Sequence, residues 1–347
     1  MVRVGIINVT GYAGAELARL LYTHPEARLS SVSGRSAAGK TLAEVFPHLT
    51  SYDLTIGEEL GEVDFAFSAL PHAASAEAVA PLVRDGVPVV DISADFRLRD
   101  VREYAQWYGV EHPAPELLSR AAYGLTELNR GAVQSARLVA NPGCYPEGAL
   151  LALAPAVKGG FVGPELIIDS KSGVSGVGRT VGLAHHFAEA NESVSAYGLG
   201  GHRHLPEIVQ ELAVMWPRRV GEDSDTQPIV TFTPHLIPMT RGILSTCYAT
   251  LVAGTVRSGE EALDLYREFY KGEPFVRVVD SPPATKQVSG SNMCLVYPTV
   301  DPRTDRLVVV SVIDNLVKGA AGQAIQNMNA MLGLPETAGL ETPAVYP

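Results

Sequence analysis

The sequence predicts an α/β fold: a doubly wound parallel sheet joined to an α+β catalytic domain whose sheet is mostly antiparallel. Over residues 1–143, short apolar strands alternate with helical segments, a pattern typical of parallel sheets. A turn with two glycines joins the first strand to the first helix. From residue 144 onward, long strands occur with few helices between them, which favours antiparallel pairing.

The composition allows a substantial core in two domains, because the chain has 347 residues of which 46% are hydrophobic. Its formal net charge of −11 disfavours nucleic acid as a partner. Its three cysteines lack the paired spacing of a disulfide framework or a metal site. The chain begins with a strand pattern rather than a signal peptide, and it has no long apolar span. We therefore expect a cytoplasmic protein with no metal, nucleic-acid or membrane partner.

The first strand is predicted at residues 2–8 and the first helix at 15–22, with Gly11 and Gly14 in or near the turn between them. Glycines in such a turn let the backbone approach a pyrophosphate, and the helix N-terminus faces the negative charge. The spacing from Gly5 through the other two glycines is a variant of the usual dinucleotide pattern. We therefore expect the parallel sheet to be a Rossmann-type sheet that binds a dinucleotide.

The second strand, residues 29–32, ends without the acidic residue that would bind the ribose 2′-hydroxyl of NAD. Ser33, Arg35, Ser36 and Lys40 occupy this region instead. A cation and hydroxyl groups suit a 2′-phosphate, so the sequence favours NADP. The alternative is a solvated turn without a ligand.

Further strands are predicted at 63–70 and 87–92, with a helix at 73–85 between them. In a parallel sheet the ligand lies beyond the carboxyl ends of the strands, which is where Ser68 lies. His72 follows the same strand, but a capping or surface role is more typical of such a histidine.

Cys144 lies between a short buried strand at 138–140 and an apolar helix at 147–157. Pro146 suits the first turn of that helix, where a missing N–H costs nothing. A cysteine ahead of a helix N-terminus is stabilised as the thiolate, its reactive form. We expect Cys144 to be a nucleophile, and the alternative is a small buried hydrophobic residue.

The second half of the chain is predicted to contain strands at 166–170, 229–234, 242–252 and 306–314, with helices at 260–270 and 316–331. The last helix is expected to pack on the first domain. This assigns residues 1–143 and 316–347 to a dinucleotide-binding domain, and residues 144–315 to a catalytic domain.

Two polar segments fall in the catalytic domain. Residues 171–179 are rich in glycine and serine, and long loops of this composition are usually functional. His202, Arg203 and His204 are consecutive and are bounded by glycine and proline. Imidazole titrates near neutral pH, so a general acid/base serving Cys144 is expected here. A zinc site would need further ligands at suitable spacing, and none is convincing.

Two turns supply further candidates. Arg241 lies in a proline-stiffened turn, where it either meets an anionic substrate or forms a structural salt bridge. Asn292 lies in a Gly/Ser turn and is able to hydrogen-bond a carboxamide such as that of nicotinamide. His185 and His186 are interpreted as a surface pair.

A dinucleotide site, an activated cysteine and a nearby base together indicate one reaction class. The thiolate attacks an activated acyl group to form a thioester, and hydride transfer then leads to an aldehyde. The thioester divides one difficult step into two easier ones. A histidine moves the proton, and backbone N–H groups stabilise the oxyanion.

The chain resembles the N-acetyl-γ-glutamyl-phosphate reductase family, which is related to aspartate-semialdehyde dehydrogenase. The motifs that carry the resemblance run in order through nearly the whole chain: GYAGAEL, SGRSAAGK, SALPH, DISADFRL, NPGCYPEGALLAL, SGVSGVGR, YGLGGHRHLPEI, FTPHLIPMTRGIL, GSN and DNLVKGAAGQAIQNMN. The resemblance implies NADPH-dependent reduction of N-acetyl-glutamyl 5-phosphate to the semialdehyde, with release of phosphate, in arginine biosynthesis. It also implies a homo-oligomer, a dimer or a tetramer, formed through the second domain.

The resemblance assigns roles to individual positions. Cys144 matches the nucleophile, and the segment with His202 and His204 matches the acid/base, with His202 favoured. Arg203 and Arg241 are the candidates for holding the anionic substrate. The cofactor positions are Gly11, Tyr12, Ala13, Gly14, Ser33, Arg35, Ser36, Ser68, Ser175, Gly176 and Asn292. Asn8 departs from the family, which more often has glycine there, and its side chain is expected to narrow the phosphate-binding turn.

Two alternatives remain. A carrier-protein-linked aminoadipyl-phosphate reductase of lysine biosynthesis would share the fold and chemistry, but would need a basic surface for its acidic carrier, which a net charge of −11 disfavours. A non-catalytic NADP-binding sensor would leave Cys144 without a role.

Overall fold

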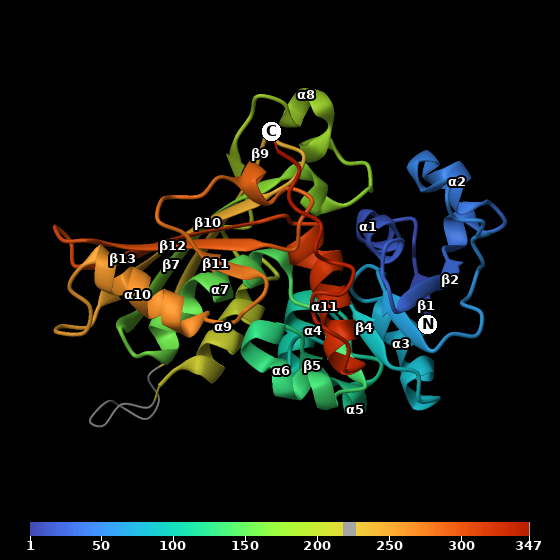
Figure 1. Ribbon diagram of the computed structural model, residues 1–347, viewed down its shortest axis with the longest axis horizontal. Helices are drawn as coiled ribbons and strands as arrows, with labels where there is room; N and C mark the ends of the chain where they lie inside the picture. The colour runs from blue at the N-terminus through green and yellow to red at the C-terminus, as the bar shows by residue number, and fades with distance from the viewer. Residues whose placement is uncertain (218–226, 347) are drawn as a thin grey trace. The chain divides into compact units, whose positions relative to one another are not determined.

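The computed structural model describes residues 1–217 and 227–346, and its internal contacts divide the chain into two units (Figure 1). The first unit comprises Met1–Gly143 and Leu316–Thr342. The second unit comprises Cys144–Asn315 and Pro343–Pro347. The chain therefore leaves the first unit immediately before Cys144 and returns to it at Leu316.

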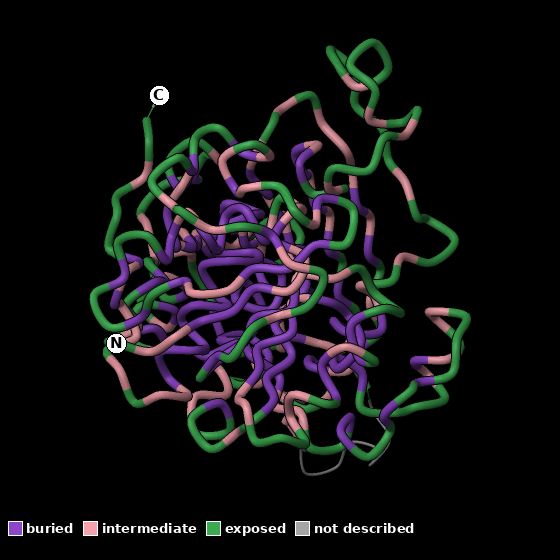
Figure 2. The backbone as a smooth tube through the Cα atoms, turned by 90° about the vertical axis from the view of Figure 1, so that its right-hand side faces the viewer, coloured by how far each residue is buried: buried purple, intermediate pink, exposed green. Residues whose placement is uncertain are grey.

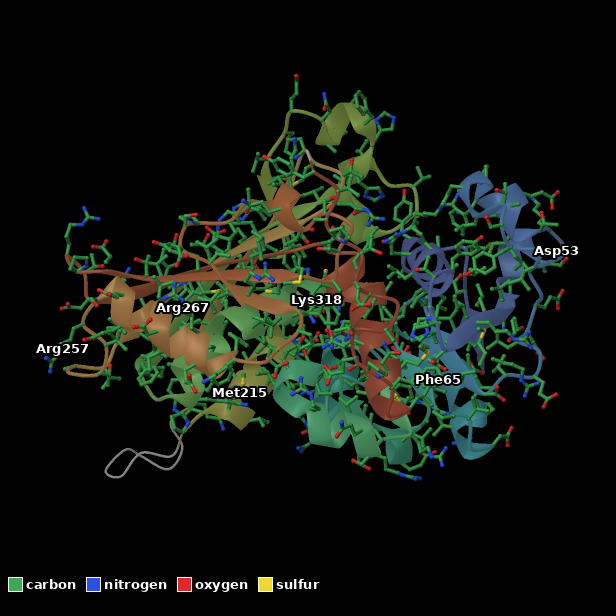
Figure 3. All side chains as sticks on the ribbon, in the orientation of Figure 1. Asp53, Phe65, Met215, Arg257, Arg267 and Lys318 are labelled. Atoms are coloured by element: carbon green, nitrogen blue, oxygen red, sulfur yellow. The ribbon has the colours of Figure 1, made fainter. Side chains whose placement is uncertain are left out.

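The first unit is built on a six-stranded parallel sheet with the order β2-β1-β3-β4-β6-β5. Its strands are β1 (Val2–Ile7), β2 (Ala27–Ser33), β3 (Phe65–Ser68), β4 (Val89–Asp91), β5 (Ala122–Tyr123) and β6 (Leu138–Ala140). Strands lie on both sides of β1, so the sheet is doubly wound and the predicted fold class is confirmed. Phe65, labelled in Figure 3, is fully buried in this sheet.

Helices follow most strands of the first unit, as a parallel sheet requires. They are α1 (Tyr12–Leu21), α2 (Leu42–Val45), α3 (Ser75–Arg84), α4 (Val101–Tyr108), α5 (Pro115–Leu118) and α6 (Thr126–Ser135). The helix predicted at 316–331 differs in detail, because it opens with a π-helical turn at Val317–Ala321 and continues as α11 (Gly322–Met331). The π-helical turn contacts α1, and α11 packs on α6.

The second unit contains a seven-stranded mixed sheet with the order β11-β12-β13-β10-β7-β9-β8. Its strands are β7 (Val162–Gly173), β8 (Ser195–Ala196), β9 (Ile229–Ile237), β10 (Ile243–Leu251), β11 (Val276–Val278), β12 (Cys294–Asp301) and β13 (Arg306–Ile313). The pairs β7/β9 and β11/β12 are parallel and the others are antiparallel, which confirms the mostly antiparallel sheet.

The helices of the second unit are α7 (Cys144–Lys158), α8 (Phe187–Ala190), α9 (Leu205–Met215) and α10 (Gly259–Phe269). Tyr145 to Val157 of α7 are all buried, because the helix packs on the sheet strands β10 and β13 and is covered by α9. The prediction of an irregular loop at 171–179 was partly wrong. β7 continues to Gly173, since its pairing with β9 and β10 outweighs the glycine content, and a 3-10 turn follows at Val174–Val177.

Candidate active site

The turn between β1 and α1 is tightly packed at Gly14. A Cβ atom on Gly14 would lie 2.6 Å from the carbonyl oxygen of Asn8 and 2.7 Å from the Cα of Val9, so only glycine fits. The helix therefore begins in close contact with the strand, at Tyr12 after the N-cap residue Gly11. The first N–H groups of α1 have no partner within the helix and are the usual donors to a phosphate. Gly11, Tyr12, Ala13 and Gly14 thus lie together at the start of the helix, and their contact with a pyrophosphate stays a prediction.

Asn8 lies at the turn, with its Nδ2 3.7 Å from where a Cβ atom on Gly11 would be, and the expected narrowing of the turn stays a prediction. Its φ of 61° is in the left-handed region, which asparagine adopts more readily than most residues. Its Nδ2 donates to the carbonyl of Ala69 at 2.8 Å, and its Oδ1 accepts from the Thr10 hydroxyl at 3.1 Å. The side chain therefore ties the turn to the residue after β3, and its amide is used within the protein.

The end of β2 carries the residues that are expected to bind the 2′-phosphate on the ribose of NADP. Ser33 is buried, and its carbonyl accepts from the backbone N–H of Val9 at 2.9 Å, which fixes this strand end beside the turn. Arg35 and Ser36 follow in a short 3-10 turn, and both are exposed, as is Lys40. The cation and the hydroxyl group at this strand end are thus available to a bound anion.

Ser68 has a structural role that the sequence did not reveal. It is fully buried, and its hydroxyl lies 2.6 Å from that of Ser75, which donates to Asp91 at 2.6 Å. Burial, together with the charge of Asp95, raises the pKa of Asp91 to about 6. The side chain of Ser68 thus belongs to an internal network, and its contact with the cofactor stays a prediction from the motif and from its place at a strand end.

Cys144 differs from the other two cysteines because it is half-buried, whereas Cys247 and Cys294 are fully buried. Burial raises the pKa of the Cys247 thiol to about 12, so that sulfur stays protonated and unreactive. Cys144 is the first residue of α7, where helix N–H groups favour a thiolate. A negative charge on its sulfur contributes, after burial, to raising the pKa of Tyr197 to about 12. The sulfur is therefore close to the segment that carries the two histidines.

An aromatic cluster surrounds the imidazole of His202. The rings of Tyr145, Tyr197 and Phe232 each pack edge-on against it, with centroids 5.5 to 5.7 Å away. The ring of His204 lies 4.9 Å from the same imidazole. The structure thus brings both predicted histidines beside the residue that follows the cysteine, whereas Arg203 between them is exposed.

His202 is held in one protonation state and one tautomer. Burial, followed by the charge of Arg203, lowers its pKa to about 4, so the ring is neutral near pH 7. The backbone N–H of His204 donates to Nδ1 of His202 at 3.1 Å. The proton of the neutral ring is therefore on Nε2, which is able to donate a hydrogen bond to a developing oxyanion.

The low pKa of His202 predicts a pH-dependent contribution to stability. Between pH 4 and pH 6.5, roughly, the His202 imidazole binds a proton in the unfolded chain but not in the folded one. Protonation therefore favours the unfolded chain in this range. The contribution to stability is complete above pH 6.5 and is lost as the pH falls to about 4. Urea unfolding of the wild type and of His202→Asn across this range checks the sign. As the pH falls, the free energy of unfolding of the wild type should decrease more than that of His202→Asn. A difference that stays constant with pH would contradict the lowered pKa of His202.

Two tyrosines that were not predicted to be site residues lie beside His202. The Tyr197 hydroxyl donates to the Tyr145 hydroxyl at 3.1 Å, and Tyr145 donates to the carbonyl of His235 at 3.1 Å. Burial raises the pKa of both phenols, so both stay protonated. His235 in turn lies 3.1 Å from the carboxylate of Asp169. Tyr145 was visible in the sequence beside Cys144, but nothing in the sequence linked it to Tyr197.

The remaining predicted residues of this unit lie around Asp314 and Asn315. Asn315 donates to the Ser175 hydroxyl at 2.9 Å and accepts from the N–H of Gly242 at 2.7 Å. Arg241 donates to the buried carboxylate of Asp314 at 3.3 Å, so the two interpretations of this arginine are compatible: it is paired and still partly exposed.

Two further predicted cofactor residues have little room around them. A Cβ atom on Gly176 would lie 3.1 Å from the hydroxyl of Ser172. Asn292 is almost completely buried. In the turn before Asn292, the N–H of Gly290 donates to Asp314. Asp314 and Asn315 were part of a quoted motif, but only the structure shows that they connect these loops.

No group of three or more His, Cys, Asp or Glu side chains among the described residues is arranged to hold a metal ion. Within residues 1–217 and 227–346, no helix has the length and apolar character needed to span a membrane.

Comparison with known proteins gives matches along the whole chain. Residues 3–136 match the family model of the semialdehyde dehydrogenase NAD binding domain, and residues 144–315 match that of the semialdehyde dehydrogenase dimerisation domain. The chain is 57% identical over 346 residues to the N-acetyl-gamma-glutamyl-phosphate reductase of Dehalococcoides mccartyi, covering 99% of each chain. It is 52% identical over 356 residues to the enzyme of the same name from Pelotomaculum thermopropionicum, covering 100% of this chain and 99% of that one.

Solved structures share the fold at low sequence identity. Aspartate semialdehyde dehydrogenase II of Vibrio cholerae is 18% identical with a TM-score of 0.70, covering 96% of this chain and 99% of that chain. The aspartate semialdehyde dehydrogenase of Candida albicans, solved with NADP, is 17% identical with a TM-score of 0.72 and the same coverage.

Proposed function

Because this chain belongs to the N-acetyl-gamma-glutamyl-phosphate reductase family, we propose that it reduces N-acetyl-L-glutamyl 5-phosphate to N-acetyl-L-glutamate 5-semialdehyde and phosphate, a step of arginine biosynthesis. The observation that carries the mechanism is the half-buried thiol of Cys144 at the start of α7, next to the cluster that holds His202 neutral. The identity with enzymes of this name over the full chain supports the choice of substrate.

In the proposed reaction, the Cys144 thiolate attacks the acyl carbon of the acyl phosphate. The bond from that carbon to the phosphate oxygen breaks, phosphate leaves and a thioester forms. NADPH, when bound, supplies the hydride. Once the thioester carbon has gained the hydride, the oxyanion that develops on its oxygen accepts a hydrogen bond from Nε2 of His202. Its collapse breaks the carbon–sulfur bond, which releases the aldehyde and restores the thiolate.

The substrate has anionic groups at both ends, and two arginines are proposed to hold them. Arg241 is oriented by its ion pair with the buried carboxylate of Asp314. Arg203 is exposed between the two histidines. A guanidinium matches the geometry of carboxylate and phosphate groups, so these side chains would orient the acyl carbon toward the sulfur. His204 is the second candidate for the acid/base.

The reverse reaction tests the proposal directly. N-acetyl-L-glutamate 5-semialdehyde should reduce NADP⁺ only when phosphate is present, because phosphate must release the acyl group from the cysteine. Absorbance of the reduced nicotinamide measures the rate. Aspartate semialdehyde, with a shorter chain and no acetyl group, is the control substrate. No phosphate-dependent rate with the acetylated substrate would contradict the proposed function.

NADP is the proposed cofactor, on the basis of the exposed Arg35 beside the turn and the clash that any side chain at Gly14 would meet. Arg35→Ala should raise the KM for NADPH about tenfold or more, since a hydrogen bond to a charged group is worth about 1.5–3 kcal/mol. The KM for NADH should change little. Arg120→Ala, an exposed arginine of the same unit, is the matched control. An unchanged KM for NADPH would assign the 2′-phosphate to other residues.

Self-association is also proposed, as a dimer or a tetramer, because the second unit matches a dimerisation domain. A cytoplasmic location stays a prediction from the sequence. The carrier-linked reductase remains the alternative substrate class, and the assay above separates the two, because it uses a free substrate.

A further inference from the structure

Asp95 follows β4 in the first unit and is completely buried, although the proposed reaction gives it no role. Four donors surround its carboxylate. The backbone N–H groups of Ala73, Ser75 and Ala76 donate to it at 2.6, 2.9 and 2.9 Å, respectively. The hydroxyl group of Tyr104 donates to it at 3.0 Å. A buried carboxylate needs such donors to replace the water that it has lost, so this side chain binds the segment that carries the three N–H groups.

These three N–H groups lie at the start of α3. The first N–H groups of a helix have no partner within it and are often bound by a capping side chain or by a phosphate. Ala74, the residue in the capping position, has no side-chain acceptor, and the carboxylate of Asp95 takes its place from another segment. The start of α3 is therefore already occupied by an anion of the protein itself. At the start of α1, by contrast, the capping residue Gly11 offers no side chain.

The same carboxylate holds the turn between β3 and α3, residues 69–74. Ala73 in this turn has a φ of 63°, in the left-handed region that residues with a Cβ atom rarely adopt. Such a conformation persists only where its surroundings hold it, and the N–H of Ala73 donates to Asp95. Residues 71–74 are exposed and belong to the class drawn green in Figure 2, whereas Asp95 belongs to the buried class drawn purple. A buried anchor thus sets the shape of a turn at the surface.

This turn lies beside the turn between β1 and α1. β1 and β3 are parallel neighbours in the sheet, so their carboxyl ends lie at the same edge. Nδ2 of Asn8, in the first turn, donates to the carbonyl of Ala69, in the second, at 2.8 Å. In a doubly wound sheet the ligand binds beyond this edge. A dinucleotide bound at the start of α1 is therefore expected to meet residues 69–74 as well.

We propose that Asp95 is a positioning residue for the cofactor, which fixes residues 69–74 in the conformation that a bound dinucleotide meets. The buried side chain acts through the backbone of this turn and does not itself touch the cofactor. The inference rests on the proposed binding of NADP. Its effect should be equal for NADPH and NADH, because they differ only in the 2′-phosphate, which is expected at the end of β2 rather than β3.

Asp95→Asn tests this role, because an amide has nearly the same size but turns an NH₂ group toward two of the four donors. The dissociation constants of NADPH and NADH should both rise about tenfold or more, and by a similar factor. Fluorescence of the reduced nicotinamide, titrated with the full-length chain in the absence of substrate, measures both constants. The kcat at saturating NADPH should change little, whereas the KM should follow the dissociation constant. Amide hydrogen exchange at residues 73–76 should become faster.

Asp64 provides the matched control at the other end of the same strand. It precedes β3, and its carboxylate also accepts from a backbone N–H, that of Arg3 at 2.9 Å. Asp64→Asn should leave both dissociation constants unchanged. Circular dichroism and thermal unfolding show whether each variant is folded. Ala73→Val disturbs the same turn at an exposed position, because a β-branched residue resists a positive φ, and it should also weaken both nucleotides.

The outcomes separate this role from the proposed function. A wild type that binds neither nucleotide would overturn the proposed cofactor, and this role with it. Binding by the wild type that neither Asp95→Asn nor Ala73→Val weakens would overturn the role of Asp95 alone. A loss confined to NADPH, or an equal loss in Asp64→Asn, would also overturn it, since neither result is expected from a turn at the carboxyl end of β3.

Discussion

Replacement of Cys144 by serine is expected to lower kcat by on the order of 10³-fold or more, the loss typical of removing a covalent nucleophile. A helix N-terminus favours the thiolate form of a cysteine, whereas a serine hydroxyl stays protonated, so the variant keeps the shape of the site but has no comparable nucleophile. Its KM should change little, because the arginines that would hold the substrate remain. The phosphate-dependent reduction of NADP⁺ measures both constants.

Cys247 offers the matched control. Its thiol is fully buried on β10, and burial raises its pKa to about 12. Cys247→Ser should cost some stability and leave kcat essentially unchanged. Iodoacetamide at neutral pH should alkylate the native wild type once per chain and should not alkylate Cys144→Ser. A Cys144→Ser enzyme with wild-type turnover would exclude the thioester route and favour direct hydride transfer to the acyl phosphate.

Short-range patterns were sufficient to predict the parts of the fold that depend on local physics. The strand, glycine turn and helix at the N-terminus follow from residue size and backbone freedom, and the clash at Gly14 shows why that position is fixed. The position of Cys144 at a helix start was also predictable, because Pro146 and the apolar run behind it are adjacent in the chain. In each case the residues that matter are close together in the sequence.

The partners of these residues could not be predicted, because they come from distant segments. Tyr197 reaches Tyr145, and Asn315 reaches Ser175, across more than fifty residues of chain. The bond from the Asn8 amide to the carbonyl of Ala69 could not be predicted for the same reason. Sequence periodicity gives the face on which a residue lies, but not the element that will cover that face.

The polar residues of α11 and of the π-helical turn before it show this limit most clearly. Lys318 and Gln326 have the polarity of a solvated helix face, yet both are completely buried in the first unit. Lys318 donates to the carboxylate of Glu127 at 2.6 Å and to the side-chain oxygens of Gln323 and Gln326. Figure 3 labels Lys318 on this returning segment. The chain therefore buries a hydrogen-bonded polar network where the sequence pattern would place solvent.

The same helix fixes the residue that precedes the Pro-Gly-Cys turn. Asn327 donates to the side-chain oxygen of Asn141 at 3.0 Å, and Asn141 donates to the carbonyl of Ala320 at 3.1 Å. The carbonyl of Asn141 also accepts from Arg97 at 2.8 Å. The end of β6 is thus held from three directions at the point where the chain leaves the first unit. Damage to the network around Lys318 should first be detectable as a loss of stability of this unit.

Lys318→Met is accordingly expected to lower the free energy of unfolding by about 3–5 kcal/mol, the cost of leaving a buried partner charge without compensation. Burial by itself would raise the pKa of Glu127, but the Lys318 ammonium lowers it overall, so the carboxylate is charged in the wild type. Without the ammonium, that charge loses its main stabilising partner. Urea or thermal unfolding of the full chain measures the loss.

The double variant Lys318→Met/Glu127→Gln decides whether the buried charge is the cause. Removing both charges leaves an amide that is still able to accept from Gln326, whose side chain lies 3.1 Å from the Glu127 oxygen. Most of the lost stability should therefore return, because replacing both partners of a buried ion pair is far less costly than removing one. A double variant as unstable as Lys318→Met would instead mean that the lysine stabilises the unit through its bonds to the two glutamines, and that the ion pair itself contributes little.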